Sequence, residues 1–332
     1  MKNLVIVESP GKCKTIEKYL GNGWKVVASV GHIRDLPVND MGISLDTFKA
    51  EYVLTDSGKR VVSNIKYLAR EADIVWLATD LDREGEAIAW HLKEALNLRN
   101  YKRITFCEIT KESILKAIKD PTDIDMNMVN SQQGRRLLDR VVGYVVSPVL
   151  STYLGQPSSA GRVQSVALRL VYDRDKNIEE FLETAHYGVE LEIETNRVNW
   201  LVKWDSSAHC TEGTSYILDK DVATAVKNIR KLTVCEYSDC EESRNPPPPF
   251  VTSTLQQAAS VNLKLSPKKT MQCAQSLYES GHITYMRTDN PNLSDDAFKM
   301  IKDYFIEQGM CDDVSDKRIE FKSPDGAQEA HV

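Results

Sequence analysis

The sequence predicts an α/β domain with a parallel sheet at its N-terminus, followed by mostly helical, then β-rich and finally helix-turn-helix-like segments. Four short apolar runs have the length and residue types of buried strands; they lie at 3–7, 24–30, 74–78 and 102–107. Helical segments with apolar residues at helical spacing alternate with these runs. Strands that alternate with helices form a parallel α/β sheet.

The composition is that of an ordinary soluble protein with room for several domains. The chain has 332 residues, 42% of them hydrophobic and 27% charged. No stretch approaches the ~18 apolar residues of a membrane span, and the first apolar run is too short for a signal peptide. The seven cysteines are scattered without a CxxC pair. These features favour reduced thiols in the cytoplasm and argue against a zinc site.

The first strand, at 3–7, ends in an acidic residue, Glu8. Ser9 can cap a helix over 10–20, which would begin with a proline and stop at a glycine. Glu8 is therefore expected at the C-terminal end of a strand, with Lys12 one helical turn further on.

A second acidic segment follows the strand at 74–78. Asp80, Asp82 and Glu84 occupy alternate positions, and in an extended segment alternate side chains point the same way. Three carboxylates that close repel one another, so the arrangement calls for a cation, and oxygen-only ligands suit Mg²⁺. Ligands of parallel sheets gather at strand C-termini, which predicts that Glu8 shares the site. The alternative is an acidic loop that caps the next helix.

Residues 121–182 are predicted to be helical and to carry a basic face. Four side chains of the helix at 131–146 share that face: Gln132, Arg135, Arg136 and Asp139. From position 131 to 176 there are seven Lys or Arg and three Asp residues, a balance of +4 in a chain of net charge −6. This contrast predicts a nucleic-acid surface, and a solvated face with intrahelical ion pairs is the alternative.

A turn of small residues at 158–164 precedes a further helix, and its backbone N–H groups can hold a phosphate. Beyond it, apolar and polar residues alternate over 187–193 as in a half-buried strand. A helix at 222–231 and a strand near Val234 complete the prediction for 183–245.

A stiff proline segment at 246–249 marks a boundary. Two helices, at 252–263 and 266–280, and a strand-like segment at 282–287 then form a helix-turn-helix-like module. In that segment Tyr285 and Arg287 fall on one side. A phenol with an ordinary pKa of about 10 is a poor nucleophile at neutral pH, but a neighbouring guanidinium and a facing phosphate favour the phenolate.

An ordered set of motifs runs almost from end to end of the chain. They are LVIVESPGKCKTIEKYLG at the start, SVGHIRDLP at 29–37, LATDLDREGEAIAWHL at 77–92, FCEITKESI at 106–114, SQQGRRLLDRVVGYVVSP at 131–148, SSAGRVQSVALRLV at 158–171, PPPPFVTSTLQQAA at 246–259, HITYMRTDN at 282–290 and AQEAH at 327–331. With these motifs the chain resembles the type IA DNA topoisomerases, most closely the bacterial ones.

The resemblance implies four domains. They are a Toprim metal-binding domain at 1–120, a helical DNA-binding segment at 121–182, a strand-rich arch segment at 183–245 and a tyrosine-bearing domain at 246–332. Family members continue long after the AQEAH motif, so the last two are expected to be incomplete. We therefore expect the tyrosine domain to be tethered through 246–249 and poorly held against the Toprim site.

The resemblance also implies the chemistry. Tyr285 would attack a backbone phosphate of single-stranded DNA without ATP, giving a 5′-phosphotyrosine and a free 3′-hydroxyl. Glu8 could protonate the departing oxygen, while Lys12 and Arg287 could stabilise charge on the phosphate. His331 matches a family histidine near that phosphate. The implied Mg²⁺ ligands are Glu8, Asp80, Asp82 and Glu84.

Residues implied to touch DNA are His32, Arg135, Arg136, Asp139, Tyr144, Ser159, Ala160, Gly161, Arg162, Val163, Gln164 and Arg287. The expected partner is single-stranded regions of negatively supercoiled DNA, which a monomer would relax in the cytoplasm, at the bacterial nucleoid. Two alternatives remain. One is a chain that binds single-stranded DNA without full relaxation activity, and the other is a Toprim nuclease or primase-like enzyme.

Overall fold

The computed structural model describes residues 2–210, 213–236, 238–242, 246–310, 314–315 and 317–322. It contains two compact units. The first combines 1–162 with 246–332, and the second is 163–245. The first unit carries the parallel sheet and the tyrosine-bearing segment.

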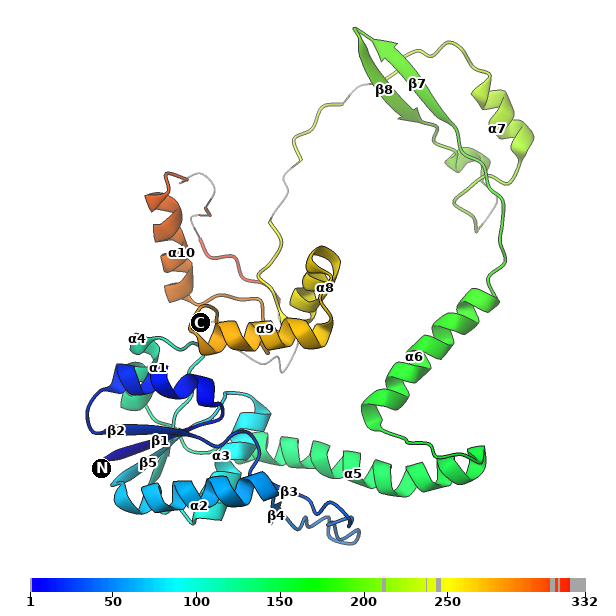
Figure 1. Cartoon of the computed structure of the whole chain (residues 1–332). Helices are drawn as coiled ribbons and strands as arrows, with labels where there is room; N and C mark the ends of the chain where they lie inside the picture. The colour runs from blue at the N-terminus through cyan, green and yellow to red at the C-terminus, as the bar shows by residue number, and fades with distance from the viewer. Residues whose placement is uncertain are drawn as a thin grey trace. The chain divides into compact units, whose positions relative to one another are not determined.

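The sheet has four parallel strands in the order β2-β1-β5-β6 (Figure 1). Their bounds are β1 Asn3–Val7, β2 Trp24–Ala28, β5 Ile74–Ala78 and β6 Tyr101–Arg103. The predicted parallel sheet is confirmed. The strand expected at 102–107 is shorter, because after Arg103 only Ile104 still donates a hydrogen bond to the neighbouring strand, at Leu77.

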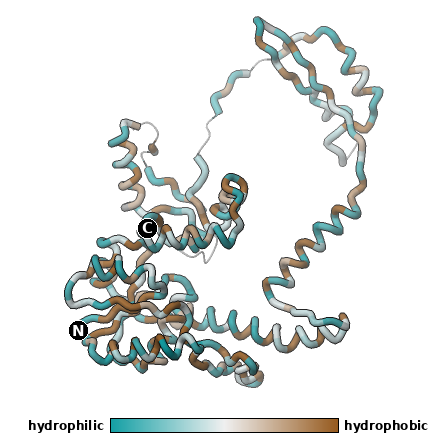
Figure 2. Tube along the Cα trace, in the orientation of Figure 1, coloured by the Kyte–Doolittle hydropathy of each residue, from teal (hydrophilic) through white to brown (hydrophobic). Residues whose placement is uncertain are grey.

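Four helices cover the two faces of the sheet: α1 Pro10–Leu20, α2 Asp56–Glu71, α3 Arg83–Leu96 and α4 Lys111–Lys119. Alternate residues of β1 point to opposite faces, as strand geometry requires. Val5 and Val7 pack in the cluster that includes α1 and α4, and Leu4 and Ile6 pack in the cluster that includes α2 and α3. Burying each of these side chains contributes about 1.5–3 kcal/mol. Figure 2 shows the strands as hydrophobic segments between helices of mixed character.

The ends of α1 follow the sequence prediction. The Ser9 hydroxyl caps the helix by accepting from Gly11 N–H at 3.3 Å, and Pro10 occupies the first position. Gly21 ends the helix with φ of +73°, a conformation that favours glycine. This cap fixes the start of α1 and therefore the position of Lys12 in its first turn.

A long helix, α5 Met126–Leu154, packs against α3. Asp125 caps it through Asn127 N–H at 2.8 Å. A two-stranded antiparallel sheet, β3 Arg34–Asp35 with β4 Val53–Leu54, lies between β2 and α2 in the chain. The helix α6 Arg162–Glu179 follows α5.

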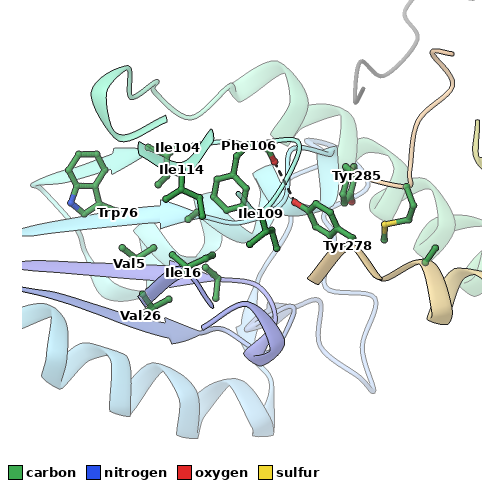
Figure 3. Close-up of a cluster of buried hydrophobic side chains, with 14 residues drawn as sticks. Val5, Ile16, Val26, Trp76, Ile104, Phe106, Ile109, Ile114, Tyr278 and Tyr285 are labelled. Carbon is green, nitrogen blue, oxygen red and sulfur yellow. Dashed lines mark hydrogen bonds between the residues drawn. The ribbon is translucent and has the colours of Figure 1, made fainter. Parts of the chain in front are cut away.

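The segment after residue 246 contains α8 Thr252–Leu263, α9 Pro267–Glu279 and α10 Asp295–Glu307. The segment predicted as a strand at 282–287 is irregular, although its Tyr285 N–H donates a hydrogen bond of 2.8 Å to Cys107 C=O. Tyr278, Tyr285 and Met286 nevertheless join the core that contains α1 and α4 (Figure 3). The expectation of a poorly held tyrosine domain is therefore wrong.

In the second unit, β7 Glu190–Thr195 pairs antiparallel with β8 Val198–Lys203, and a 3₁₀ turn, η1 Ser207–His209, and α7 Lys220–Lys227 follow. The strand expected near Val234 is not formed within the described residues 213–236. Trp200 and Leu201 are exposed on β8. Among the helices of the described residues, none has the length and apolar character needed to cross a membrane.

Candidate active site

Glu8 and the acidic segment after β5 lie at the same edge of the sheet. β1 and β5 are parallel neighbours in register, with Val7 opposite Ala78, so the residues that follow both strands leave from the carboxyl edge. This is the edge where parallel α/β sheets bind their ligands. The charge of Asp80 contributes, after burial, to raising the pKa of Glu8, in keeping with the expectation that the two carboxyl groups lie near each other.

Asp80 forms a buried ion pair with Lys12. The Lys12 ammonium is completely buried, donates to Asp80 Oδ1 and lies 4.8 Å from the centre of the Tyr278 ring. Asp80 itself is 8% exposed. The aromatic face and the carboxylate together compensate a charge that would be costly to bury alone.

Tyr285 and Arg287 both meet Asp82. The Tyr285 hydroxyl donates to Asp82 Oδ2 at 2.6 Å, and Arg287 Nη1 donates to the same oxygen at 3.2 Å. Tyr285 is only 1% exposed. Burial, followed by the negative charges of Asp82 and Asp80, raises the pKa of Tyr285 far above its ordinary value. The phenol is therefore held as a neutral hydrogen-bond donor in this arrangement.

Glu8 is suited to carry a proton near neutral pH. Burial, together with the charge of Asp80, raises the pKa of Glu8 to about 7, against the lowering effect of Lys12. A carboxylic acid that titrates near neutral pH can give up or take up a proton at little cost.

Glu84 points to different partners from those of Asp80 and Asp82. Its Oε2 accepts from His32 Nε2 at 3.0 Å and from Gln132 Nε2 at 3.0 Å. The hydrogen bond from His32 lowers the pKa of Glu84, and the same bond raises the pKa of His32. The expected alternation of side chains fails because β5 ends at Ala78 and α3 begins at Arg83.

The turn between β5 and α3 explains the difference. Asp82 is the N-cap of α3 and accepts from Gly85 N–H at 2.8 Å, so Glu84 already lies in the first helical turn. The acidic-cap alternative thus describes Asp82, although the same carboxylate also binds Tyr285. One side chain serves both the helix terminus and the nucleophile candidate.

The donor chemistry at this edge suits a hard divalent cation. Within the described part of the chain, no three Asp, Glu, His or Cys side chains stand together in a metal-binding arrangement. Glu8, Asp80 and Asp82 nevertheless repel one another, and after burial the charges of Asp80 and Asp82 help to raise the pKa of Glu8. Oxygen ligands of this kind bind Mg²⁺. The positive charges of Lys12 and Arg287 also lie beside Asp80 and Asp82.

A pocket of about 270 Å³ adjoins Glu84 and the basic face of α5. Its lining comprises His32, Arg34, Asp35, Tyr52, Glu84, His91, Gln132, Arg135, Arg136 and Asp139. Arg136 donates two hydrogen bonds to the Asp35 carboxylate, of 2.9 and 2.6 Å. The prediction that Arg135, Arg136 and Asp139 share a face is confirmed, and that face lines an open pocket.

Other expected DNA-contacting residues have neighbours of their own. Tyr144 donates to Val38 C=O at 3.1 Å, and Arg162 pairs with Asp139 at 2.9 Å. In the small-residue turn, Ala160 N–H donates to the Ser147 hydroxyl at 3.0 Å. Ser159 and Gly161 complete the turn, and Val163 and Gln164 lie in the first turn of α6. His331 lies outside the described residues.

Several residues of the site escaped sequence reasoning. Tyr278 stacks edge-on to Tyr285, with ring centres 5.2 Å apart, and its hydroxyl donates to Phe106 C=O (Figure 3). Arg103 and Glu86 form a buried ion pair behind Asp80. For Glu86 the sequence offered one signal, its position one helical turn after Asp82. Tyr278 reaches the site through tertiary packing, which no local sequence pattern indicates.

Two protein-family models together match most of the chain. The Toprim domain family matches residues 3–109, and a family described as DNA topoisomerase matches residues 123–332. A curated relative, "DNA topoisomerase I, plasmid" of Xylella fastidiosa, is 47% identical over 331 residues, covering 99% of this chain and 50% of that protein. DNA topoisomerase 1 of Escherichia coli is 41% identical over 365 residues, covering 99% of this chain and 42% of its own length.

A solved structure is similar as well. Full-length topoisomerase I from Thermotoga maritima superposes with a TM-score of 0.79 at 39% identity, covering 92% of this chain and 52% of that one. The chain thus spans about half the length of the relatives it matches.

Proposed function

Because the chain belongs to the DNA topoisomerase family and carries a Toprim domain, we propose that it breaks and rejoins single-stranded DNA through a covalent bond to Tyr285. One observation carries the proposal: the Tyr285 hydroxyl and Arg287 meet on Asp82 at the carboxyl edge of the sheet. The substrate is a single-stranded region of negatively supercoiled DNA, and no ATP is consumed.

The proposed chemistry is a reversible transfer of a phosphate ester. The Tyr285 oxygen attacks a backbone phosphorus while its proton passes to Asp82, which already accepts that hydrogen bond. The P–O bond to the 3′ oxygen breaks, and Glu8 protonates the leaving oxygen. This leaves a 5′-phosphotyrosine and a free 3′-hydroxyl. Attack of that hydroxyl on the phosphotyrosine restores the strand, with the proton transfers reversed.

Two cationic side chains can balance the negative charge of a phosphate, and they differ in how far they are exposed to solvent. Arg287 has a side chain that is 53% exposed and can reach a bound phosphate. Lys12 is completely buried on Asp80, so it can reach a phosphate only after that pair opens. We therefore assign the first contact with the phosphate to Arg287.

Glu8, Asp80 and Asp82, with Glu84 beside them, would hold Mg²⁺, which when bound neutralises the carboxylates and orients phosphate oxygens. The arrangement described above is closed, since Tyr285 is only 1% exposed. Binding of DNA must therefore open this arrangement far enough for a phosphate to reach the Tyr285 oxygen, while the hydroxyl keeps its hydrogen bond to Asp82. This feature also favours the alternative that the chain binds single-stranded DNA without relaxing supercoils.

A cleavage assay with end-labelled single strands tests the proposal. With Mg²⁺ and denaturation by detergent, a 3′-labelled oligonucleotide should migrate as a protein adduct, and a 5′-labelled one as a shorter free strand. Both products should disappear in Tyr285→Phe. Cleavage that survives in Tyr285→Phe would indicate a Toprim nuclease, and binding without cleavage would indicate a DNA-binding protein. Relaxation of a negatively supercoiled plasmid tests the complete cycle separately.

A further inference from the structure

Arg103 is a completely buried arginine at the end of β6, directly behind the turn that carries Asp80. Its Nη1 donates to the carbonyl oxygens of Thr79 at 2.8 Å and Ile104 at 2.7 Å, and its Nη2 donates to the Asp80 carbonyl at 2.8 Å. Lys12 meanwhile holds the Asp80 carboxylate. Asp80 is therefore fixed from two sides, through its backbone and through its side chain.

Glu86 balances the charge of Arg103 and extends the contact to α5. Its Oε2 accepts from Arg103 Nε at 2.9 Å and Nη2 at 2.8 Å, and its Oε1 accepts from Asp125 N–H at 2.8 Å. Asp125 is the N-cap of α5, and Glu86 lies one turn after Asp82 on α3. The two residues thus join the β5–α3 turn to the start of the helix that carries Arg135 and Arg136.

The ion pair has no role in the proposed chemistry, because neither side chain reaches solvent or the Tyr285 hydroxyl. The Arg103 side chain is 0% exposed and the Glu86 side chain is 5% exposed. A buried ion pair is often replaceable by apolar side chains without loss of stability, so stability alone does not explain its presence. Its hydrogen bonds converge instead on the backbone that aims Asp80.

We propose that Arg103 and Glu86 are positioning residues, which hold the Asp80 and Asp82 carboxylates in the spacing that a divalent cation requires. The inference rests on the proposed function, in which those carboxylates bind the cation. Partners behind metal ligands typically change metal affinity about 10- to 100-fold when they are replaced. The guanidinium is specific here, because its three nitrogens donate in a fixed planar fork to Glu86 and to the backbone carbonyls, whereas an ammonium donates from a single nitrogen.

The test is a titration of the 332-residue chain with Mn²⁺ by calorimetry, without DNA. The double variant Arg103→Met/Glu86→Leu removes both charges together, so no unpaired charge is left in the core. We expect it to fold and to bind Mn²⁺ about tenfold more weakly than wild type. Should the double variant fail to fold, Arg103→Lys keeps the positive charge and is expected to weaken Mn²⁺ binding as well.

Ile65→Val, a substitution in the core between α2 and the sheet, is the control for destabilisation alone and should keep wild-type Mn²⁺ affinity. Unchanged affinity in the folded double variant, or in Arg103→Lys when the double variant is unfolded, would overturn the inference while leaving the proposed function intact. Wild-type protein whose Mn²⁺ binding is absent, or is unaffected by Asp80→Asn, would overturn the proposed cation site and this inference together.

Discussion

Arg34 Nε donates a hydrogen bond of 3.0 Å to Nδ1 of His91, a side chain that is 2% exposed. The bond requires Nδ1 to be unprotonated, so His91 is neutral when the pair is formed. Burial, and then the positive charge of Arg34, lower the pKa of His91 to about 3. The rings of Tyr52 and Trp90 enclose the pair, 4.8 and 4.7 Å from the His91 ring centre.

This pair predicts a loss of stability in mild acid. The pKa of His91 is about 3 in the folded chain and ordinary, near 6.5, in the unfolded one. Between those values only the unfolded chain binds the proton, so acidification favours unfolding. The contribution is fully present above pH 6.5 and falls by about 1.4 kcal/mol for each pH unit below it.

Urea unfolding of wild type and His91→Gln at several pH values between 5 and 7.5 measures this contribution. Glutamine keeps a neutral acceptor for Arg34 but cannot take up the proton. The free energy of unfolding should therefore fall less steeply with acid in the variant. The difference between the two slopes should correspond to the uptake of about one proton on unfolding. Parallel curves for the two proteins would show that His91 has the same pKa in the folded and unfolded chain, contrary to this prediction.

The sequence predicted the fold of the first unit well, because that fold depends on local signals. Strand length, the Ser9 cap and the stop at Gly21 are all readable over a few residues. The alternation predicted for Asp80, Asp82 and Glu84 does not continue to Glu84, because Asp82 caps α3 and Glu84 already lies in its first turn. The placement of Tyr285 against Asp82, 203 residues earlier, could be expected only from family resemblance, since no local pattern encodes it.

Tyr285→Phe should remove the adduct while leaving the fold almost as stable as wild type. The ring keeps its packing against Tyr278, and the Asp82 carboxylate retains Gly85 N–H and Arg287 as donors. Losing one hydrogen bond while the acceptor stays satisfied costs about 1 kcal/mol. Thermal unfolding beside the cleavage assay measures both effects. A loss of several kcal/mol would mean that the phenol holds the two segments together.

The basic face of α5 predicts unequal roles for two neighbouring arginines. Arg136 is engaged by the Asp35 carboxylate, whereas Arg135 lines the pocket beside it. Each phosphate contact on a single strand contributes about −0.7 to the slope of log affinity against log salt. Arg135→Ala should therefore make that slope shallower by about this amount.

Asp35→Asn is the matched test of the neighbouring pair. It removes the charge that occupies Arg136, so single-stranded DNA should bind more tightly and with a steeper dependence on salt. Both slopes can be measured by fluorescence anisotropy of a labelled oligonucleotide from about 50 to 200 mM salt. An unchanged slope in Arg135→Ala would mean that Arg135 does not contact the DNA backbone.

The last prediction compares two glycines: Gly85, which packs against the turn at Asp80, and Gly134, which lies inside the helix α5. A Cβ atom on Gly85 would lie 2.2 Å from the Asp80 carbonyl oxygen and 2.8 Å from its nitrogen, so the backbone of the turn must move. Gly85→Ala should cost about 2 kcal/mol or more in free energy of unfolding. A Cβ on Gly134, in the middle of α5, would meet nothing within 4 Å, and alanine is favoured over glycine there by about 1 kcal/mol. Gly134→Ala should therefore stabilise the chain. Equal effects of the two substitutions in urea unfolding would mean that the turn has room to relax, and that the position of Asp80 does not depend on Gly85.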